Sequence, residues 1–180
     1  PIYGLGQDAS GRPFYAMRFI RGDSLADAIR RFHDRGRGDG PANRHELELR
    51  ELLGRFIDVC DAVAYAHSRG VLHRDLKPGN VMLGPFGETM VVDWGLAMAL
   101  EIGTPLYMPP EQADGAVEKL GPTSDVYGLG AILYEVLTGR PPVEGERVEE
   151  VLGKVRRGEI AAPRKVRPDV PAGLEAVCLK

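Results

Sequence analysis

The stretch that decides the fold is residues 73–80, which read HRDLKPGN. It places an acid, an amide and a lysine within six residues, as Asp75, Asn80 and Lys77. The stretch lies between a long segment of periodic apolar residues and a short apolar run. A second acid, Asp93, follows in residues 91–95, which read VVDWG. Carboxylate and amide oxygens are ligands that magnesium prefers, so the pattern indicates a polar, cation-binding site.

Together the two motifs resemble those of the eukaryotic-type, bacterial-looking serine/threonine protein kinases, where H-R-D-L-x-x-x-N precedes an Asp-aromatic-Gly triplet. The resemblance covers nearly the whole chain and is strongest over residues 71–111 and 124–142. It implies an α+β, protein-kinase-like fold with a mainly helical large lobe. It also implies transfer of the γ-phosphoryl group of Mg-ATP to Ser or Thr hydroxyl groups of protein substrates.

The resemblance assigns a role to each polar residue of the two motifs. Asp75 is expected to accept or orient the proton of the substrate hydroxyl group, and Lys77 to stabilise the moving phosphoryl group. Asn80 and Asp93 are expected to bind magnesium. Asp93 alone fits an ordinary turn acid equally well, and its position after Asp75 and Asn80 favours the metal-binding interpretation. Lys77 favours Ser/Thr substrates over Tyr.

Residues 103–111, GTPLYMPPE, resemble the substrate-docking loop of the same family. By this resemblance Thr104 bridges Asp75 and Lys77. Glu111 would pair in the family with an arginine located beyond Lys180, so we expect its carboxylate to lack a partner here, at a cost in stability.

Residues 17–25, MRFIRGDSL, resemble the hinge that joins the two lobes of a kinase. In that interpretation Met17 lines the adenine pocket, the Arg18 carbonyl and the Ile20 amide pair with the adenine edge, and Met82 forms the pocket floor. A plain strand leading into a helix fits the same residues. Their position ahead of residues 73–80 favours the hinge.

We expect residues 1–180 to be a partial kinase domain, truncated at both ends, with the last two strands of the small lobe in residues 1–19. Residues 20–180 would be the hinge and large lobe. No lysine precedes Lys77, and no third glycine follows Gly4 and Gly6 at the phosphate-loop spacing. The phosphate loop and strand lysine would therefore lie in a missing small-lobe segment of the parent chain. The 180 residues alone are expected to be inactive.

Apolar periodicity predicts the helices of the large lobe. One helix begins after Ser24, a six-turn helix over residues 49–66 ends before Gly70, and the most apolar helix opens at residues 123–125 and ends at Gly139. Shorter helices are predicted over residues 148–155 and from residue 174. We expect His67 to be a packing residue, and Asp125, by the resemblance, to accept backbone N–H bonds from the catalytic loop. Trp94 should pack beside His73.

The composition excludes few classes of function and is consistent with an enzyme domain. Apolar residues make up 43% of the chain and the net charge is −3, which gives no reason to expect nucleic acid or an anionic membrane as a partner. No run of eighteen apolar residues occurs, so no membrane segment is predicted within the chain. Cys60 and Cys178 fall in apolar patterns and are expected to pack unpaired, which suits a reducing cytoplasm.

Two other classes of function compete with an active protein kinase. A pseudokinase that serves only as a docking surface is disfavoured because Asp75, Lys77, Asn80 and Asp93 are all present. A small-molecule phosphotransferase of kinase-like fold would lack the docking loop. Residues 95–102 contain no Ser, Thr or Tyr. We therefore hypothesise that Glu101 supplies a fixed negative charge for Arg74 in place of a phosphate group.

Overall fold

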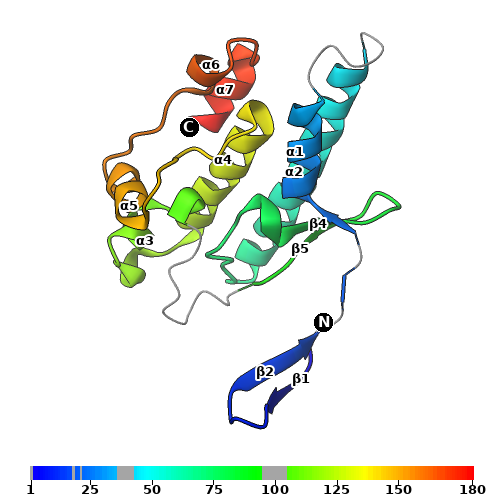
Figure 1. Cartoon of the computed structure of the whole chain (residues 1–180), viewed down its shortest axis with the longest axis vertical. Helices are drawn as coiled ribbons and strands as arrows, with labels where there is room; N and C mark the ends of the chain where they lie inside the picture. Colours follow the sequence, from blue (N-terminus) through cyan, green and yellow to red (C-terminus); the bar gives the residue numbers. More distant parts are fainter. Residues whose placement is uncertain (1, 18, 21, 36–42, 95–104) are drawn as a thin grey trace.

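The computed structural model describes residues 2–17, 19–20, 22–35, 43–94 and 105–180. Its first two strands, β1 (Ile2–Gln7) and β2 (Pro13–Met17), form an antiparallel hairpin in which the backbones of Leu5 and Tyr15 pair. The Asp8 carboxylate closes the turn by accepting the Ser10 and Arg12 amides at 2.8 and 3.0 Å. Both predicted strands are confirmed. Figure 1 shows the hairpin extending away from the helical part of the molecule.

A second sheet lies against the helices and has the order β3–β4–β5, with both pairs antiparallel. Its strands are β3 (Asp23–Ser24), β4 (Val81–Leu83) and β5 (Thr89–Val91). In the centre of β4, Met82 pairs with Ser24 on one side and Met90 on the other. This small sheet anchors the segment immediately after the HRDLKPGN motif.

Helix α1 (Leu25–Asp34) begins where the sequence predicted, because Ser24 forms a capping box with Asp27. The Ser24 hydroxyl oxygen accepts the Asp27 amide at 3.1 Å, and the Asp27 carboxylate accepts from the Ser24 amide at 3.3 Å. Helix α2 (Arg44–Ser68) follows, and Gly70 adopts a left-handed conformation two residues after its end. The predicted helix and its stop are thus confirmed, and the helix begins at Arg44, before the predicted range of residues 49–66.

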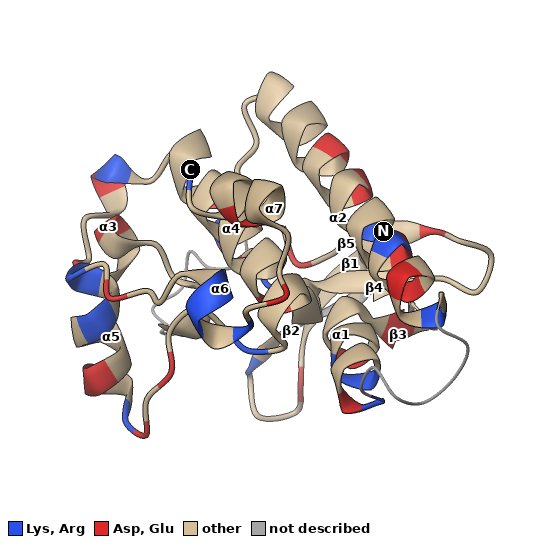
Figure 2. Cartoon of the chain, turned by 90° about the horizontal axis from the view of Figure 1, so that it is seen from above, with Lys and Arg blue, Asp and Glu red and all other residues tan. Residues whose placement is uncertain are grey.

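Helix α4 (Pro122–Thr138) is the axis of the helical part and ends at Gly139, whose φ of 77° is left-handed. The main core forms where α4 packs with α1 and α2. Its centre consists of side chains that are at most 2% exposed: Leu25, Ile29, Val59, Val63, Ile132 and Val136. Figure 2 shows α4 largely free of charged residues, whereas acidic and basic residues both lie along α5.

The remaining elements are short and surround α4. They are η1 (Pro78–Asn80), η3 (Pro105–Tyr107), α3 (Pro110–Ala113), η4 (Val117–Lys119), α5 (Val148–Arg156), α6 (Pro163–Val166) and α7 (Ala172–Cys178). A second apolar cluster joins Ala113 of α3 to Val151 of α5, together with Met108 and Val143 from the connecting segments. Figure 1 shows these two helices side by side. The predicted helices over residues 148–155 and from residue 174 are confirmed within one or two residues.

Both cysteines are free thiols, as predicted, and burial raises the pKa of Cys178 to about 11. Within the described ranges, no helix has the length and apolar character needed to cross a bilayer.

Candidate active site

The loop between α2 and η1 brings three of the predicted site residues into contact. The Lys77 Nζ atom donates to Asp75 Oδ2 at 2.7 Å. The Asn80 Nδ2 atom donates to the same oxygen at 3.0 Å and to the Asp75 carbonyl at 2.8 Å. The Asp75 side chain remains 25% exposed, so its carboxylate is held by two donors and is still accessible to a substrate.

Asp125, at the start of α4, accepts hydrogen bonds from the backbone of this loop. Its Oδ2 atom accepts the His73 amide at 2.9 Å, and its Oδ1 atom accepts the Arg74 amide at 2.8 Å. Arg74 has a φ of 70°, a left-handed conformation that costs a residue with a side chain about 1–2 kcal/mol. The 1%-exposed Asp125 carboxylate offsets this cost by binding two consecutive amides. The bonds implied by the family resemblance are confirmed.

His67 is more than the packing residue that the sequence analysis expected. Its Nε2 atom lies 2.7 Å from Asp125 Oδ2. Because a carboxylate only accepts hydrogen bonds, Nε2 carries the hydrogen in this pair. The two residues are 58 positions apart, and only the packing of the end of α2 against the start of α4 brings them together. Local sequence carries no signal for this contact.

His73 connects the catalytic loop to the strand that precedes Asp93. Its Nε2 atom donates to the Val92 carbonyl at 2.9 Å, and its Nδ1 atom accepts the Asp75 amide at 3.3 Å. Burial lowers the pKa of His73, in agreement with the neutral ring that these two bonds require. The Trp94 ring packs beside it at 4.8 Å between centroids, as predicted.

The Val92 amide donates to the Asn80 carbonyl at 2.9 Å, which brings the residue next to Asp93 against Asn80. Asp93 has a left-handed φ of 64°. The hydrogen bonds of the Asn80 side chain use Nδ2, so Oδ1 is the atom suited to a cation. An amide and a carboxylate oxygen fit magnesium. Within the described residues no group of three or more His, Cys, Asp or Glu side chains suits a metal ion.

The predicted hinge residues are described only in part. Arg18 lies outside the described residues, and for Met17 only the backbone is described, at the end of β2. Half-buried Ile20 lies between β2 and β3, in the segment that connects the two sheets. Half-buried Met82 lies at the centre of β4. Thr104 and Glu101 also fall outside the described residues, so the contacts predicted for them remain predictions.

The docking segment contains two contacts that the sequence analysis did not find. The Ser124 hydroxyl donates to Glu111 Oε1, so the expectation that this carboxylate lacks a partner is wrong. The Tyr107 hydroxyl donates to Glu135 Oε2 at 2.6 Å, and burial raises the pKa of both groups. A glutamate inside the most apolar helix was the available signal for the second contact, since a buried carboxylate requires a donor.

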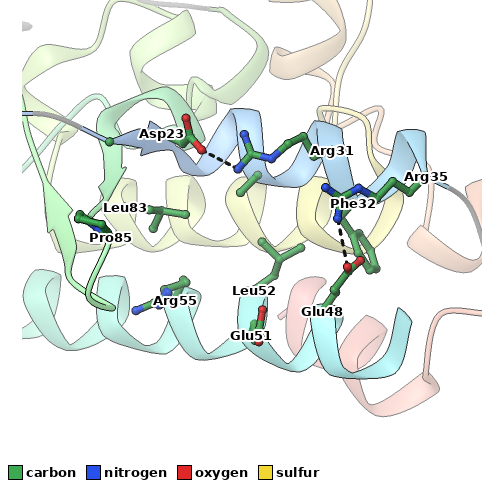
Figure 3. A pocket seen from close by; sticks show the side chains of 13 residues that line it. Asp23, Arg31, Phe32, Arg35, Glu48, Glu51, Leu52, Arg55, Leu83 and Pro85 are labelled. Atoms are coloured by element: carbon green, nitrogen blue, oxygen red, sulfur yellow. Dashed lines mark hydrogen bonds and ion pairs between the residues drawn. The ribbon is translucent and has the colours of Figure 1, made fainter. Parts of the chain in front are cut away.

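A groove of about 560 Å³ lies away from Asp75. It runs between α1, α2 and the turn from β4 to β5, over an apolar floor that includes Phe32 and Leu52. Figure 3 shows Arg31 and Arg35, on the rim of this groove, directed toward acids. Arg31 contacts Asp23 at 2.9 Å, and Arg35 contacts Glu48 at 3.2 Å. A smaller cavity borders Asp75 together with Tyr107, Met108 and Gln112, where the catalytic loop meets the docking segment.

One loop joins an acid, a lysine and an amide, and an adjacent strand pair is followed by a second acid. This arrangement defines the class of protein kinases. A family model described as "Protein kinase domain" matches residues 10–172. The chain therefore belongs to the protein kinase family.

Among its relatives, serine/threonine-protein kinase PknD of Protochlamydia amoebophila is 33% identical over 211 residues, covering 99% of this chain and 21% of that protein. PknB of Mycolicibacterium smegmatis is 35% identical over 181 residues, covering 93% and 27%. PknB of Mycobacterium tuberculosis is 31% identical over 194 residues, covering 99% and 29%. The chain thus spans less than a third of the length of these relatives.

Proposed function

We propose that the protein carrying this chain is a serine/threonine protein kinase that transfers the γ-phosphoryl group of ATP to Ser or Thr hydroxyl groups of proteins. The observation that carries the proposal is the contact of Lys77 and Asn80 with the Asp75 carboxylate. The names of the relatives, which are serine/threonine-protein kinases, support the same substrate class.

In the proposed reaction the substrate hydroxyl oxygen attacks the γ-phosphorus while the bond to the β-phosphate oxygen breaks and ADP leaves. Lys77 and Asn80 both contact Oδ2 of Asp75, which leaves Oδ1 to receive the hydroxyl proton. The Lys77 ammonium group would stabilise the charge of the transferring phosphoryl group. Thr104 would bridge Asp75 and Lys77 and bring the docking segment to the site.

The donor set fits one magnesium ion held by Asn80 Oδ1 and Asp93. When bound, magnesium neutralises charge on the nucleotide phosphates. The adenine ring would lie against Met17, the Arg18 carbonyl, the Ile20 amide and Met82. The position of Ile20 between the two sheets supports this placement.

The proposed domain boundaries are the ones expected from the sequence. Residues 1–19 would belong to the small lobe and residues 20–180 to the hinge and large lobe, with a further small-lobe segment of the parent chain supplying the phosphate loop and strand lysine. Protein substrates bearing Ser or Thr would be its partners. The two free thiols support action in the reducing cytoplasm.

The test uses the full-length protein with Asp75→Asn and Asp93→Asn variants. Asp75→Asn should abolish phosphoryl transfer while leaving the Kd for Mg-ATP unchanged, because the residue acts on the substrate hydroxyl group. Asp93→Asn should weaken Mg-ATP binding as well. Asp61→Asn, on the exposed side of α2, is the matched control and should change neither quantity. Equal loss of nucleotide affinity in the two site variants would contradict the assigned roles.

A further inference from the structure

The groove between α1, α2 and the turn from β4 to β5, called the α1–α2 groove below, has no part in the proposed reaction. Its apolar floor consists of Ala28, Phe32, Leu52 and Leu83, which belong to the main core or pack against it. Its volume of about 560 Å³ is within the roughly 300–1,000 Å³ of typical ligand sites. The size and lining of the α1–α2 groove therefore suit the binding of apolar groups.

Contacts at both ends fix the walls of the α1–α2 groove. Arg35 of α1 contacts Glu48 of α2 at 3.2 Å, and Figure 3 shows this pair at one end. Toward the other end, Arg55 of α2 donates to the Gly87 carbonyl, which connects α2 to the turn from β4 to β5. Because the walls are held before a ligand binds, little binding free energy is lost to their reorganisation.

The charges on the rim of the α1–α2 groove are paired, with one exception. Five of the six charged side chains that line it have partners: Asp23, Arg31, Arg35, Glu48 and Arg55. The sixth is Glu51, an exposed acid on α2 whose side chain makes no hydrogen bond or ion pair with the residues that the structure describes. Glu51 is therefore the charge available to a ligand, and it favours a lysine or arginine.

An exposed aromatic ring lies beside the α1–α2 groove. Phe86 directly follows the lining residue Pro85 in the turn from β4 to β5, and it is 91% exposed. The Phe86 amide donates to Glu88 Oε2 at 2.9 Å, so the backbone of the turn is held in place. A phenyl ring in water adds little to the stability of the fold, whereas aromatic side chains dominate binding interfaces. The apolar contact surface thus extends beyond the volume that a small molecule would fill.

We propose that the α1–α2 groove binds an extended segment of a partner protein, with apolar side chains on the groove floor and on Phe86 and a lysine or arginine at Glu51. The lining residues of α2 extend from Glu48 to Arg55, which is about 10 Å along the helix axis. About three residues of an extended chain cover this length. The inference goes beyond phosphoryl transfer, because this binding requires neither ATP nor Asp75.

The probe is a phage-displayed library of short random peptides, selected against the full-length protein with its ATP site filled by a non-hydrolysable ATP analogue. We expect the enriched peptides to combine apolar residues with a lysine or arginine. The same selection against Glu51→Lys should enrich Asp or Glu in place of the basic residue, because the variant reverses the charge that the ligand meets. Glu51 is exposed, so the substitution leaves the core intact.

Fluorescence anisotropy of an enriched basic peptide then measures the contribution of each residue. Glu51→Lys should raise the Kd about fivefold, as expected for an exposed ion pair, and Phe86→Ser about tenfold, as expected for a buried aromatic ring. Asp61→Lys on α2 and Phe14→Ser on the hairpin are the matched controls, because both residues are exposed outside the groove. Both controls should leave the Kd unchanged, and circular dichroism compares the fold of all variants.

The outcomes separate this site from the proposed kinase function. Asp75→Asn should bind the peptide with the wild-type Kd even though it transfers no phosphate, and a weaker Kd would place the peptide at the active site and overturn the inference. Enrichment of no basic and apolar peptide, or an unchanged preference for lysine and arginine in Glu51→Lys, would also overturn it. Equal affinity of the peptide for the wild type and Phe86→Ser would contradict the assigned contact surface.

Discussion

Tyr107 connects the docking segment to the central helix through a single hydrogen bond to Glu135. Both groups are partly buried, and burial raises the pKa of the Glu135 carboxyl group. A buried carboxylate that loses its donor is destabilised by its own desolvation. The bond therefore holds η3 against α4, next to the cavity that borders Asp75.

Tyr107→Phe should lower the free energy of unfolding by about 1–3 kcal/mol, because Glu135 then lacks the hydroxyl donor. Urea unfolding followed by circular dichroism measures the change. Tyr127→Phe is the matched control, since within the described residues its hydroxyl group makes no hydrogen bond to the protein. Equal losses of unfolding free energy in the two variants would show that the bond to Glu135 does not cause the destabilisation.

The hydrogen bonds of His33 depend on the protonation state of its ring. Its Nε2 atom lies 3.0 Å from the Val136 carbonyl, which only accepts, and its Nδ1 atom faces an Arg167 guanidinium nitrogen, which only donates. The folded protein therefore holds the ring neutral. Burial lowers the pKa of His33 and outweighs the bond to the Val136 carbonyl, which raises it; nearby Arg167 and His45 also lower the pKa, and Asp169 raises it.

Because the folded-state pKa of His33 lies below the ordinary value of 6.5, the unfolded chain binds more protons as the pH falls. The contribution of His33 is thus fully present above about pH 6.5 and is lost progressively below it. We expect the free energy of unfolding to fall between pH 7 and pH 5, and to fall less in His33→Gln. Parallel pH profiles of the two proteins, measured by urea unfolding, would exclude this role.

At the scale of elements, α1 begins at a cap that the sequence alone predicted. Ser24 and Asp27 satisfy each other's amides, and the same Ser24 pairs with Met82 in the small sheet. The cap therefore connects the start of α1 to the strand that follows the catalytic loop. Its loss should affect the stability of the helix and its attachment to the sheet.

Ser24→Ala should cost about 1 kcal/mol of stability, the usual cost of removing an N-cap side chain. Ser24→Thr keeps the hydroxyl group and should restore most of the loss. Thermal unfolding monitored by calorimetry compares the two variants with the wild type. A Tm for Ser24→Thr as low as that for Ser24→Ala would argue against the capping hydrogen bond as the cause.

At the scale of the whole molecule, the β1–β2 hairpin and the helical part differ in how they are stabilised. The helical part has a continuous core along α4, whereas the hairpin exposes large apolar side chains: Tyr3 is 69%, Leu5 86% and Phe14 52% exposed. A two-stranded sheet is marginally stable in water and presents unpaired edges. The hairpin therefore depends on further contacts to be stable.

We predict that residues 1–180, purified as a separate polypeptide, phosphorylate a generic protein substrate little or not at all. These residues contain no lysine before Lys77 to hold the α- and β-phosphates of ATP, and the exposed hairpin favours aggregation. A radiolabelled-ATP assay beside the full-length protein measures the difference. Robust turnover by the 180 residues would refute the prediction.

The features that the sequence by itself determined are local. The HRDLKPGN motif, the Ser24 cap, the stops at Gly70 and Gly139 and the apolar periodicity of α2 and α4 each depend on residues a few positions apart. Local φ/ψ preferences and helical spacing decide such features. For this reason the helices, and the gathering of Asp75, Lys77 and Asn80 in one short loop, were predictable.

Only the tertiary structure decided the contacts between distant elements. His67 meets Asp125 across 58 residues, Tyr107 meets Glu135 across 28, and His33 meets Arg167 across 134. Each depends on how two helices or a helix and a loop pack, and a shift of one turn would separate the partners. Local sequence does not encode that register, so these contacts could emerge only from the folded molecule.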